Sequence, residues 1–400
     1  MPGPLDGIKI LDLTIYQNGP WGTVMLSDMG ADVLKIEDPV NGDPGRNLTP
    51  AGSGHRRRVN TYFQTMNRNK RSMTLNLKCD QGRAIFFKMV QHADVVTQNF
   101  RVGVVERLGV DYEACRSHNP RIIYASVSGF GPKGPDARDG VYDILGQARG
   151  GMMSLLSIND PGIVYRSGGG LADQMGAFTL AYGVLLGIIA RERTGKGQHV
   201  EVSQLGGQLI HQALAFNAYL LNAEMPMPRA QQATNPLFDI YRCADDRWIA
   251  LGCIQSDRYW PAICQVLGID HLRDDPKFAD HAARLGSSPE LKAALEEIFQ
   301  TRSRDQWIAL LKEEGVLCTP VQNYDDLAND PQVVANEYLA EVDHPTLGKL
   351  RQVGVPVKLS ETPGAVRSAA PEFGQHTEEV LLDHGYSWDD IASFRDQAVV

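Results

Sequence analysis

Ile8-Lys-Ile-Leu-Asp-Leu13 and Asp32-Val-Leu-Lys-Ile-Glu37 are the two stretches of sequence that decide the fold. Both are short and rich in aliphatic residues, which is typical of strands buried in a sheet. Pro20 favours a helix start between them, and Gly30 favours its end after Met29. Because a strand, a helix and a second strand follow one another, the segment predicts a βαβ unit with parallel strands.

The alternation continues along the first half of the chain. We expect further strands at Met73–Leu77, Asp94–Thr97, Ile122–Val127 and His199–Ser203, and helices at 80–92, 172–193 and 204–222. The pattern therefore predicts an α/β fold with a large domain over residues 1–224. A change of texture predicts a smaller α+β domain over 225–330, with a hairpin at Asp239–Cys243 and Trp248–Leu251. Residues 331–400 are expected to return to the large domain.

Composition excludes several classes of protein. The 400 residues carry a net charge of -9, which disfavours nucleic acid as a partner. The six cysteines are scattered without metal-ligand spacing, so we expect neither a metal site nor a disulfide framework. The first residues lack a secretory signal pattern, and the apolar stretch Leu180–Ala190 is too short to span a bilayer. We expect a cytoplasmic protein with no membrane partner.

Gly129-Phe-Gly-Pro-Lys-Gly134 matches the spacing of a dinucleotide-binding loop and follows a predicted strand. Such a loop must lead into a helix, whose N-terminus holds the pyrophosphate. Pro132 and Pro135 prevent a helix from starting here. We therefore reject a nicotinamide site.

Asp173 lies where the glycines of Ser167-Gly-Gly-Gly-Leu171 lead into an apolar helix. An ionised carboxylate at that place, close to backbone N–H groups and open to a ligand, has the geometry of a nucleophile. An acidic residue in the first turn of a helix is also stabilising without any catalytic role. The residues alone leave both interpretations open.

Two clusters of cations, His55-Arg-Arg-Arg58 and Arg68-Asn-Lys-Arg71, stand out in an acidic chain. Guanidinium groups match phosphate and carboxylate, so either cluster can be an anion site, or both can be solvated loops. Gln98-Asn-Phe-Arg101 follows a predicted strand, at the edge where α/β sheets bind ligands.

Several strings taken together resemble the class III CoA-transferases, the family of formyl-CoA transferase and carnitine CoA-transferase. They occur in family order over nearly the whole chain. The strings are Leu5–Thr14, Gly30–Glu37, Asn67–Leu75, Ala93–Phe100, Asn119–Arg121, Ser128–Gly131, Ala172–Asp173, Arg193–Gly197 and Gly374–Glu378. The resemblance implies a Rossmann-like large domain with a parallel sheet, a smaller α+β domain, and an interlocked homodimer.

The resemblance also implies an activity, the movement of CoA from an acyl-CoA thioester to a carboxylic acid. Asp173 matches the catalytic aspartate, which would form an aspartyl anhydride and then an aspartyl-CoA thioester. Gln17 matches a polar active-site residue, and Asp143 matches an acidic residue near the nucleophile. No tightly bound cofactor is implied, since coenzyme A is substrate and product. Backbone N–H groups of Gly168–Gly170 are candidate oxyanion donors.

The family's CoA contacts map onto matching positions of this chain. These positions are Gln17, Asn18, Leu75, Lys78, Asn99, Phe100, Arg101 and Arg107. Asp38 and Gly140 depart from the pattern, because some relatives carry arginine and lysine there. We expect Arg68, Lys70 or Arg71 to replace those cations at the CoA phosphates. Tyr142, Arg166 and Gly169 are the candidate contacts to the acyl group or acid.

Two other functions remain as alternatives. One is an α-methylacyl-CoA racemase, although Tyr142 stands where racemases have histidine, and tyrosine is a poor base at neutral pH. The other is a CoA-binding protein without catalysis. Leu251–Ser256 matches a glycine-rich loop of formyl-CoA transferases but has one glycine, which disfavours a formyl/oxalate pair. Arg166 and Arg56–Arg58 favour a dicarboxylic acid as the second substrate.

Overall fold

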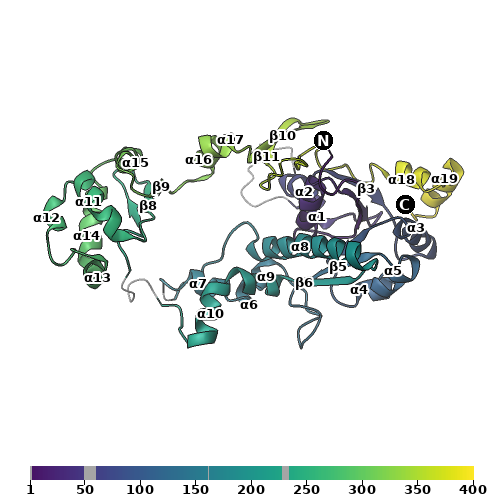
Figure 1. The fold of residues 1–400 in the computed structure, drawn as a ribbon. Coiled ribbons are helices and arrows are strands. Elements are labelled where there is room, and N and C mark those ends of the chain that lie inside the picture. The colour runs from purple at the N-terminus through teal and green to yellow at the C-terminus, as the bar shows by residue number, and fades with distance from the viewer. Residues whose placement is uncertain (1, 49–59, 161, 228–233) are drawn as a thin grey trace. The chain divides into compact units, whose positions relative to one another are not determined.

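The computed structural model describes residues 2–48, 60–160, 162–227 and 234–400. The chain forms two compact units (Figure 1). The larger unit contains Met1–Ser157, Gly162–Glu224 and Val334–Val400, and the smaller unit contains Ile158–Pro161 and Met225–Val333. The cluster His55–Arg58 lies outside the described residues.

The larger unit is built on a six-stranded parallel sheet in the order β3-β2-β1-β4-β5-β6. The strands are β1 (Lys9–Asp12), β2 (Asp32–Glu37), β3 (Lys70–Thr74), β4 (Val95–Gln98), β5 (Ile123–Ser128) and β6 (His199–Ser203). This confirms the prediction of an α/β fold with a parallel sheet. The order reverses direction between β1 and β4, and sheets of this kind bind ligands at such a switch point.

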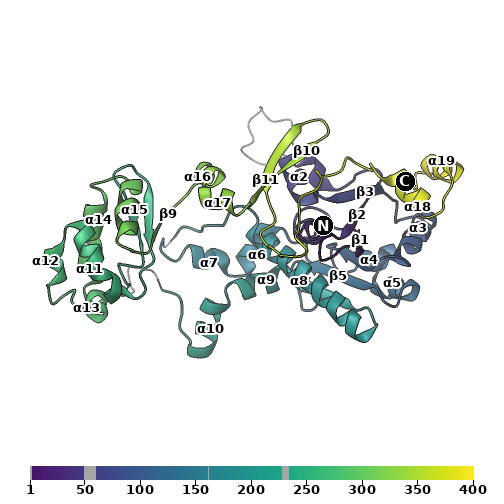
Figure 2. The same cartoon turned by 45° about the horizontal axis from the view of Figure 1, so that its top comes forward.

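Helices cover both faces of the sheet (Figures 1 and 2). α1 (Asn18–Asp28) and α8 (Leu171–Thr194) lie on one face, and α3 (Asp80–Val90), α5 (Tyr112–His118) and α18 (Thr377–Asp383) pack on the other. Alternate residues of each strand therefore meet different helices. Leu11 packs with Phe86 of α3, whereas its neighbour Ile10 packs with Leu180 of α8.

α8 is the long helix predicted at 172–193. By length and composition alone it could cross a bilayer, a test that central helices of globular proteins also pass. One side of α8 lies tightly on the sheet, because Gly183 and Gly187 let the backbone approach Val200 and Ile123. A Cβ atom at Gly183 would lie 2.6 Å from Val200. Packing on the sheet therefore explains why this side of α8 carries glycines.

Two predicted elements differ in the structure. β3 begins at Lys70 rather than Met73, because Lys70 already pairs with Val33 of β2, and its ammonium is buried and paired instead of solvated. The helix predicted over 204–222 is two helices, α9 (Gln204–His211) and α10 (Ala213–Asn222). Gln212 lies between them, and its side-chain amide donates to the carbonyl of Gly150, 2.8 Å away.

The C-terminal segment completes the edge of the sheet at β3. The N–H of His376 donates to the carbonyl of Ser72, and the hydroxyl of Thr377 accepts from the N–H of Thr74. The other elements assigned to this unit are η1 (Pro44–Asn47), α2 (Thr61–Asn67), α4 (Val104–Leu108), α6 (Asp143–Arg149), α7 (Met152–Leu156), β10 (Leu339–His344), β11 (Gly348–Val353) and α19 (Trp388–Asp396).

The smaller unit has an antiparallel sheet of three strands, β7 (Ile240–Arg242), β8 (Trp248–Leu251) and β9 (Cys318–Pro320). β7 and β8 form the predicted hairpin. Trp260, Phe299 and Trp307 lie in its core. Its helices are α11 (Ser256–Leu267), α12 (Asp270–Arg273), α13 (His281–Gly286), α14 (Ser288–Phe299), α15 (Arg304–Glu313) and α16 (Tyr324–Asn329), and α17 (Pro331–Ala335) follows at the boundary between the units.

A buried ionic network lies at the carboxyl end of β1. Asp12 ends β1 and pairs with Lys70 of β3 at 3.0 Å, and Lys35 of β2 pairs with Asp43 at 2.8 Å; all four side chains are fully buried. Lys35 also donates to the carbonyl of Thr14 at 2.7 Å. The network therefore joins β1, β2, β3 and the loop that follows β1.

Asp12 is the centre of this network. It accepts hydrogen bonds from the hydroxyls of Thr14, Thr23 and Thr97. Burial by itself would raise the pKa of Asp12, but Lys70, Lys35 and the hydroxyls outweigh it and hold the pKa well below its usual range. Asp12 is therefore ionised in the folded protein at neutral pH.

Replacement of Asp12 should destabilise the protein strongly. We expect Asp12→Ala to lower the free energy of unfolding by about 3–5 kcal/mol, because Lys70 is left buried without its partner. Asp6→Ala, which removes an exposed carboxylate from the segment before β1, should change it by less than about 0.5 kcal/mol. Urea denaturation measures both, and equal losses would contradict the role given to the network.

Candidate active site

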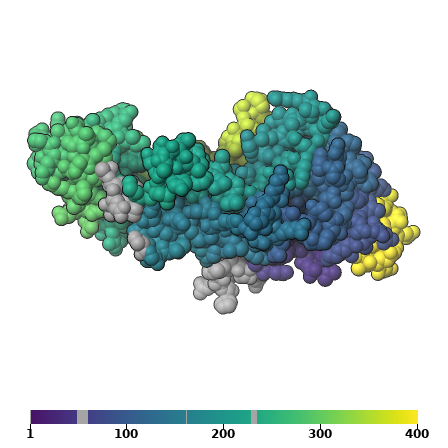
Figure 3. Space-filling view, turned by 90° about the horizontal axis from the view of Figure 1, so that it is seen from below, coloured from purple at the N-terminus to yellow at the C-terminus, as the bar shows by residue number. Residues whose placement is uncertain are grey.

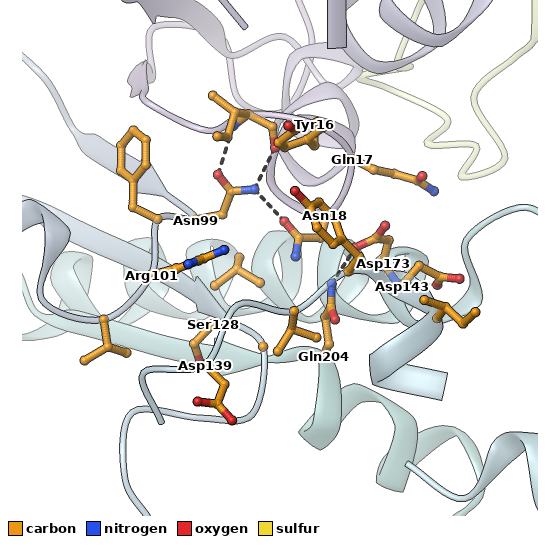
Figure 4. A pocket seen from close by; sticks show the side chains of 18 of the residues that line it. Tyr16, Gln17, Asn18, Asn99, Arg101, Ser128, Asp139, Asp143, Asp173 and Gln204 are labelled. Carbon is orange, nitrogen blue, oxygen red and sulfur yellow. Dashed lines mark hydrogen bonds between the residues drawn. The ribbon is translucent and has the colours of Figure 1, made fainter. Parts of the chain in front are cut away.

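A cavity of about 700 Å³ opens at the carboxyl ends of β1, β4 and β5, next to the switch point of the sheet (Figure 4). Its walls come from the loops after these strands, the start of α6 and the start of α8. Nine of the predicted site residues line it: Gln17, Asn18, Asn99, Phe100, Arg101, Tyr142, Asp143, Arg166 and Asp173. The structure thus brings together residues spread over more than 150 positions of the chain.

The loop after β1 is fixed by the buried network. Asp43, which pairs with Lys35, also accepts the N–H of Tyr16 at 3.0 Å. Tyr16 has a φ of 62°, an uncommon backbone conformation for a residue with a side chain. The bend directs the following residues, Gln17 and Asn18, to the cavity.

Asn99 joins the ends of β4 and β1. Its side chain accepts the N–H of Ile15 at 2.9 Å and donates to the carbonyl of Ile15 at 2.7 Å and to Oδ1 of Asn18 at 2.6 Å (Figure 4). These bonds use both hydrogens of the Asn99 amide. The Nδ2 of Asn18, in contrast, makes no hydrogen bond to the residues described, so it is the amide free for a ligand.

Asp143, not Asp173, satisfies the N-terminus of α8. Oδ1 of Asp143 accepts the N–H of Ala172 at 2.7 Å and that of Asp173 at 3.2 Å. Gln147 orients this carboxylate by donating to its Oδ2 at 2.6 Å, and also bonds the backbone of Ser167 in both directions. Asp173 lies in the first turn of α8 but is not its N-cap, which is Gly170, and its side chain lines the cavity.

The Asp173 carboxylate receives one hydrogen bond from the described residues, from Nε2 of Gln204 to Oδ1 (Figure 4). Burial and then the negative charge of Asp143 raise the pKa of Asp173 to about 7, against the lowering effect of Gln204. We expected an ionised carboxylate at this junction. The correction is that Asp173 titrates near neutral pH, because it is buried beside a second carboxylate.

Gln17 lies beside the glycine turn before α8. Its Nε2 donates to the carbonyl of Gly169 at 3.3 Å. A Cβ atom on Gly170 would lie 2.2 Å from that nitrogen, and Gly170 has a φ of 78°. The left-handed backbone favours glycine here, and a side chain at this position would displace the Gln17 amide from the start of α8.

Three predicted CoA contacts do not line this cavity: Leu75, Lys78 and Arg107. Leu75 is buried in the core beside α3. Lys78 pairs with Asp38 at 3.0 Å, at the surface. Asp38, where we noted a departure from the family pattern, therefore engages a neighbouring cation. Gly140 packs against the guanidinium of Arg101, where a side chain would collide.

The expectation of a phosphate contact is wrong for Arg68 and Lys70; Arg71 is partly exposed, and its contact stays a prediction. Arg68 and Lys70 are buried and pair with Asp28 at 2.7 Å and with Asp12. Arg71 pairs with Asp32 at 2.8 Å. Each cation has a carboxylate partner in a strand or helix packed against it. Arg68 and Lys70 therefore have a structural role.

Gln204 and Tyr62 line the cavity and were not found from the sequence. Gln204 is the first residue of α9, directly after β6. The only available signal was its place at the carboxyl end of a predicted strand.

In the described part of the chain, no three His, Cys, Asp or Glu side chains gather as a metal site requires. The string Gly129–Gly134 does not lead directly into a helix, because the next helix of the described chain, α6, starts at Asp143.

Comparison with known proteins places this site in context. The family model of CoA-transferase family III matches residues 5–377. An acetyl-CoA:oxalate CoA-transferase of Acetobacter aceti is 36% identical over 91% of this chain and 92% of its own length. A succinyl-CoA:mesaconate CoA-transferase of Haloarcula marismortui is 34% identical over 96% and 97%.

A solved structure supports the same relationship. The crystal structure of a CAIB/BAIF family protein from Brucella suis is similar, with a TM-score of 0.85 and 30% identity over 96% of this chain and all of that one. The similarity extends over nearly the whole chain. The chain belongs to CoA-transferase family III and is an acyl-CoA:carboxylate CoA-transferase.

Proposed function

We propose that the enzyme transfers CoA through covalent intermediates on Asp173. The observation that carries this is an aspartate whose Oδ2 accepts no hydrogen bond from the described residues, on the wall of a cavity at the switch point. Oδ2 attacks the thioester carbonyl, the C–S bond breaks, and CoA leaves as a thiolate. The acyl group and Asp173 are then joined as a mixed anhydride.

The thiolate next attacks the carbonyl carbon of Asp173. An aspartyl-CoA thioester forms, and the first acid leaves as a carboxylate. The acceptor acid reverses both steps, so the energy of the thioester is retained. Asn18 and Gln17 offer amide N–H groups for the oxygen of the substrate carbonyl, together with the backbone of Gly168–Gly170.

Because Asp173 must be ionised to attack, kcat/KM should fall below about pH 7.

Loss of Asp173 should abolish transfer without abolishing CoA binding. We expect Asp173→Ala to reduce kcat by at least about 10⁴-fold, since the nucleophile is missing. Mass spectrometry of wild-type enzyme mixed with donor thioester should find an adduct on the peptide containing Asp173. Asp139→Ala, which removes another carboxylate from the cavity wall, should still form it. Turnover without any adduct at Asp173 would contradict the covalent mechanism.

We further propose that the acceptor is a dicarboxylic acid. Arg166 lines the cavity as an exposed guanidinium with the planar geometry that binds a second carboxylate. The relatives named above act on oxalate and mesaconate, and others are named for succinyl-CoA with D-citramalate and for formyl-CoA with oxalate. All these acceptor acids carry two carboxylates.

An acceptor screen tests this substrate class. With succinyl-CoA as donor, we expect diacids such as oxalate and mesaconate to yield new CoA thioesters by chromatography. Arg166→Met should raise KM for the diacid by about 10-fold or more, because a charge-assisted pair contributes about 1.5–3 kcal/mol. Monocarboxylic acids serve as the control, and their KM should change little. Failure with every diacid would remove the proposal.

We also propose that the enzyme acts in the cytoplasm and needs no tightly bound cofactor.

We propose in addition that it is a homodimer. α10 has no buried residue although it is mostly apolar, with Leu214 and Leu221 91% and 80% exposed. On α8, Phe178 and Tyr182 are also exposed. Figure 3 shows teal side chains, the colour of α8 to α10, over one face of the larger unit. Apolar patches of this kind mark subunit interfaces.

Sedimentation measures the oligomeric state directly. We expect the wild-type protein at micromolar concentration to have twice the chain mass of 44.0 kDa. A second copy would remove the apolar side chains of α10 from water, at about 25 cal/mol per Å². A protein that stays monomeric and active at this concentration would contradict the homodimer.

A further inference from the structure

Gln204 is held rigidly beside the nucleophile. It opens α9 directly after β6, and the preceding Ser203 caps the helix by accepting the N–H of Gly206 at 3.0 Å. Its side chain is almost fully buried, at 1% exposure. A Cβ atom on Gly146 of α6 would lie 2.8 Å from Gln204 Oε1, so a glycine gives the amide its room.

The two oxygens of Asp173 are not equivalent. Oδ1 accepts the hydrogen bond from Gln204 Nε2, whereas Oδ2 accepts none from the described residues. The N–H groups of Ala172 and Asp173 are both taken by Asp143. Gln204 is therefore the single donor to the Asp173 carboxylate among the described residues, and it distinguishes Oδ1 from Oδ2.

The two ends of the Gln204 amide differ in their hydrogen bonding. Its Oε1 is buried with no hydrogen-bond partner among the described residues. An unsatisfied buried acceptor costs about 1–3 kcal/mol, and methionine would fill similar space without it. Of the two polar ends of the Gln204 amide, only Nε2 makes a hydrogen bond to the described residues, and its partner is Asp173.

We propose that Gln204 is a catalytic residue that stabilises the oxyanion formed at the aspartyl carbonyl, as distinct from the carbonyl of the substrate. This inference rests on the covalent mechanism proposed above. In that mechanism Oδ2 attacks the substrate and becomes the bridging oxygen of the anhydride. Oδ1 remains as the carbonyl oxygen of Asp173, still facing Nε2 of Gln204.

The step that Gln204 assists is the attack of CoA thiolate on Cγ of Asp173. A sulfur lone pair forms the S–Cγ bond, and the π electrons of the Cγ=Oδ1 bond move to Oδ1, where Gln204 donates to the oxyanion. When the Cγ=Oδ1 bond forms again, the Cγ–Oδ2 bond breaks and its electron pair leaves with the acid as a carboxylate. No oxidant, reductant or net proton is needed.

This role separates the two chemical steps. Formation of the anhydride depends on donors to the substrate carbonyl, such as Asn18 and Gln17. Formation of the aspartyl-CoA thioester depends on Gln204. Removal of one oxyanion donor typically costs 10²–10³ in rate. Loss of Gln204 should therefore slow the second step far more than the first.

Gln204→Met and Gln208→Met form a matched pair for the test. Gln208 is one turn further along α9, equally buried, and its amide also lacks a hydrogen-bond partner among the described residues. Each enzyme is mixed with succinyl-CoA, or with the donor that the acceptor screen identifies, and quenched at intervals. Intact-protein mass spectrometry then distinguishes the acyl adduct from the heavier CoA adduct.

In the wild type and in Gln208→Met, we expect the CoA adduct to form quickly. In Gln204→Met, the acyl adduct should accumulate and the CoA adduct should appear about 10²-fold more slowly or later. Gln204→Leu, which has no donor at any pH, should give the same block if the methionine variant does not fold. The pH below which kcat/KM falls should also be higher than in the wild type. Loss of a donor to the charged carboxylate raises the pKa of Asp173.

Formation of the CoA adduct at the wild-type rate in either Gln204 variant would overturn the proposal. So would an equal slowing of both adducts with an unchanged pH dependence of kcat/KM, which indicates a structural role only. Turnover by wild-type enzyme with neither adduct would instead reject the covalent mechanism itself. The two failures are therefore distinguishable.

Discussion

The buried pairing of Asp12 with Lys70 and of Lys35 with Asp43 is the interaction on which the rest of the structure depends. Charges removed from water are costly unless they are paired and hydrogen-bonded, and here the hydroxyls around Asp12 and the carbonyl of Thr14 complete the pairing. The network ties β1, β2 and β3 to one another and to the loop that follows β1. The network therefore fixes the position of the loop after β1, which forms part of the cavity wall.

The loop after β1 is placed by direct contact. Asp43 holds the backbone of Tyr16, and Asn99 holds that of Ile15, so the amides of Gln17 and Asn18 face the cavity. Opposite them, Asp143 occupies the free N–H groups at the start of α8 and leaves the carboxylate of Asp173 to the ligand. Burial and the charge of Asp143 then tune Asp173 to titrate near neutral pH.

Much of the fold could be predicted from the sequence, because strand and helix signals arise from residues close together in the chain. β2 and β6 have the predicted bounds, and α8 differs by one residue at each end. The cations of β3 show where this reasoning fails. Lys70 looks like a solvated or ligand-binding residue until Asp12, 58 positions away, is seen against it. Gln204 was missed because nothing near it in the sequence indicates that its amide meets Asp173.

The sequence by itself determined the α/β alternation, the family and the presence of an aspartate at a glycine-rich helix start. These depend on local periodicity and on ordered strings that need no knowledge of contacts. Only the tertiary structure decided which charges neutralise one another, which oxygen of Asp173 is held, and which amides are free. The reason is physical: pairing energies and pKa shifts depend on burial and on distances of about 3 Å between residues remote in sequence.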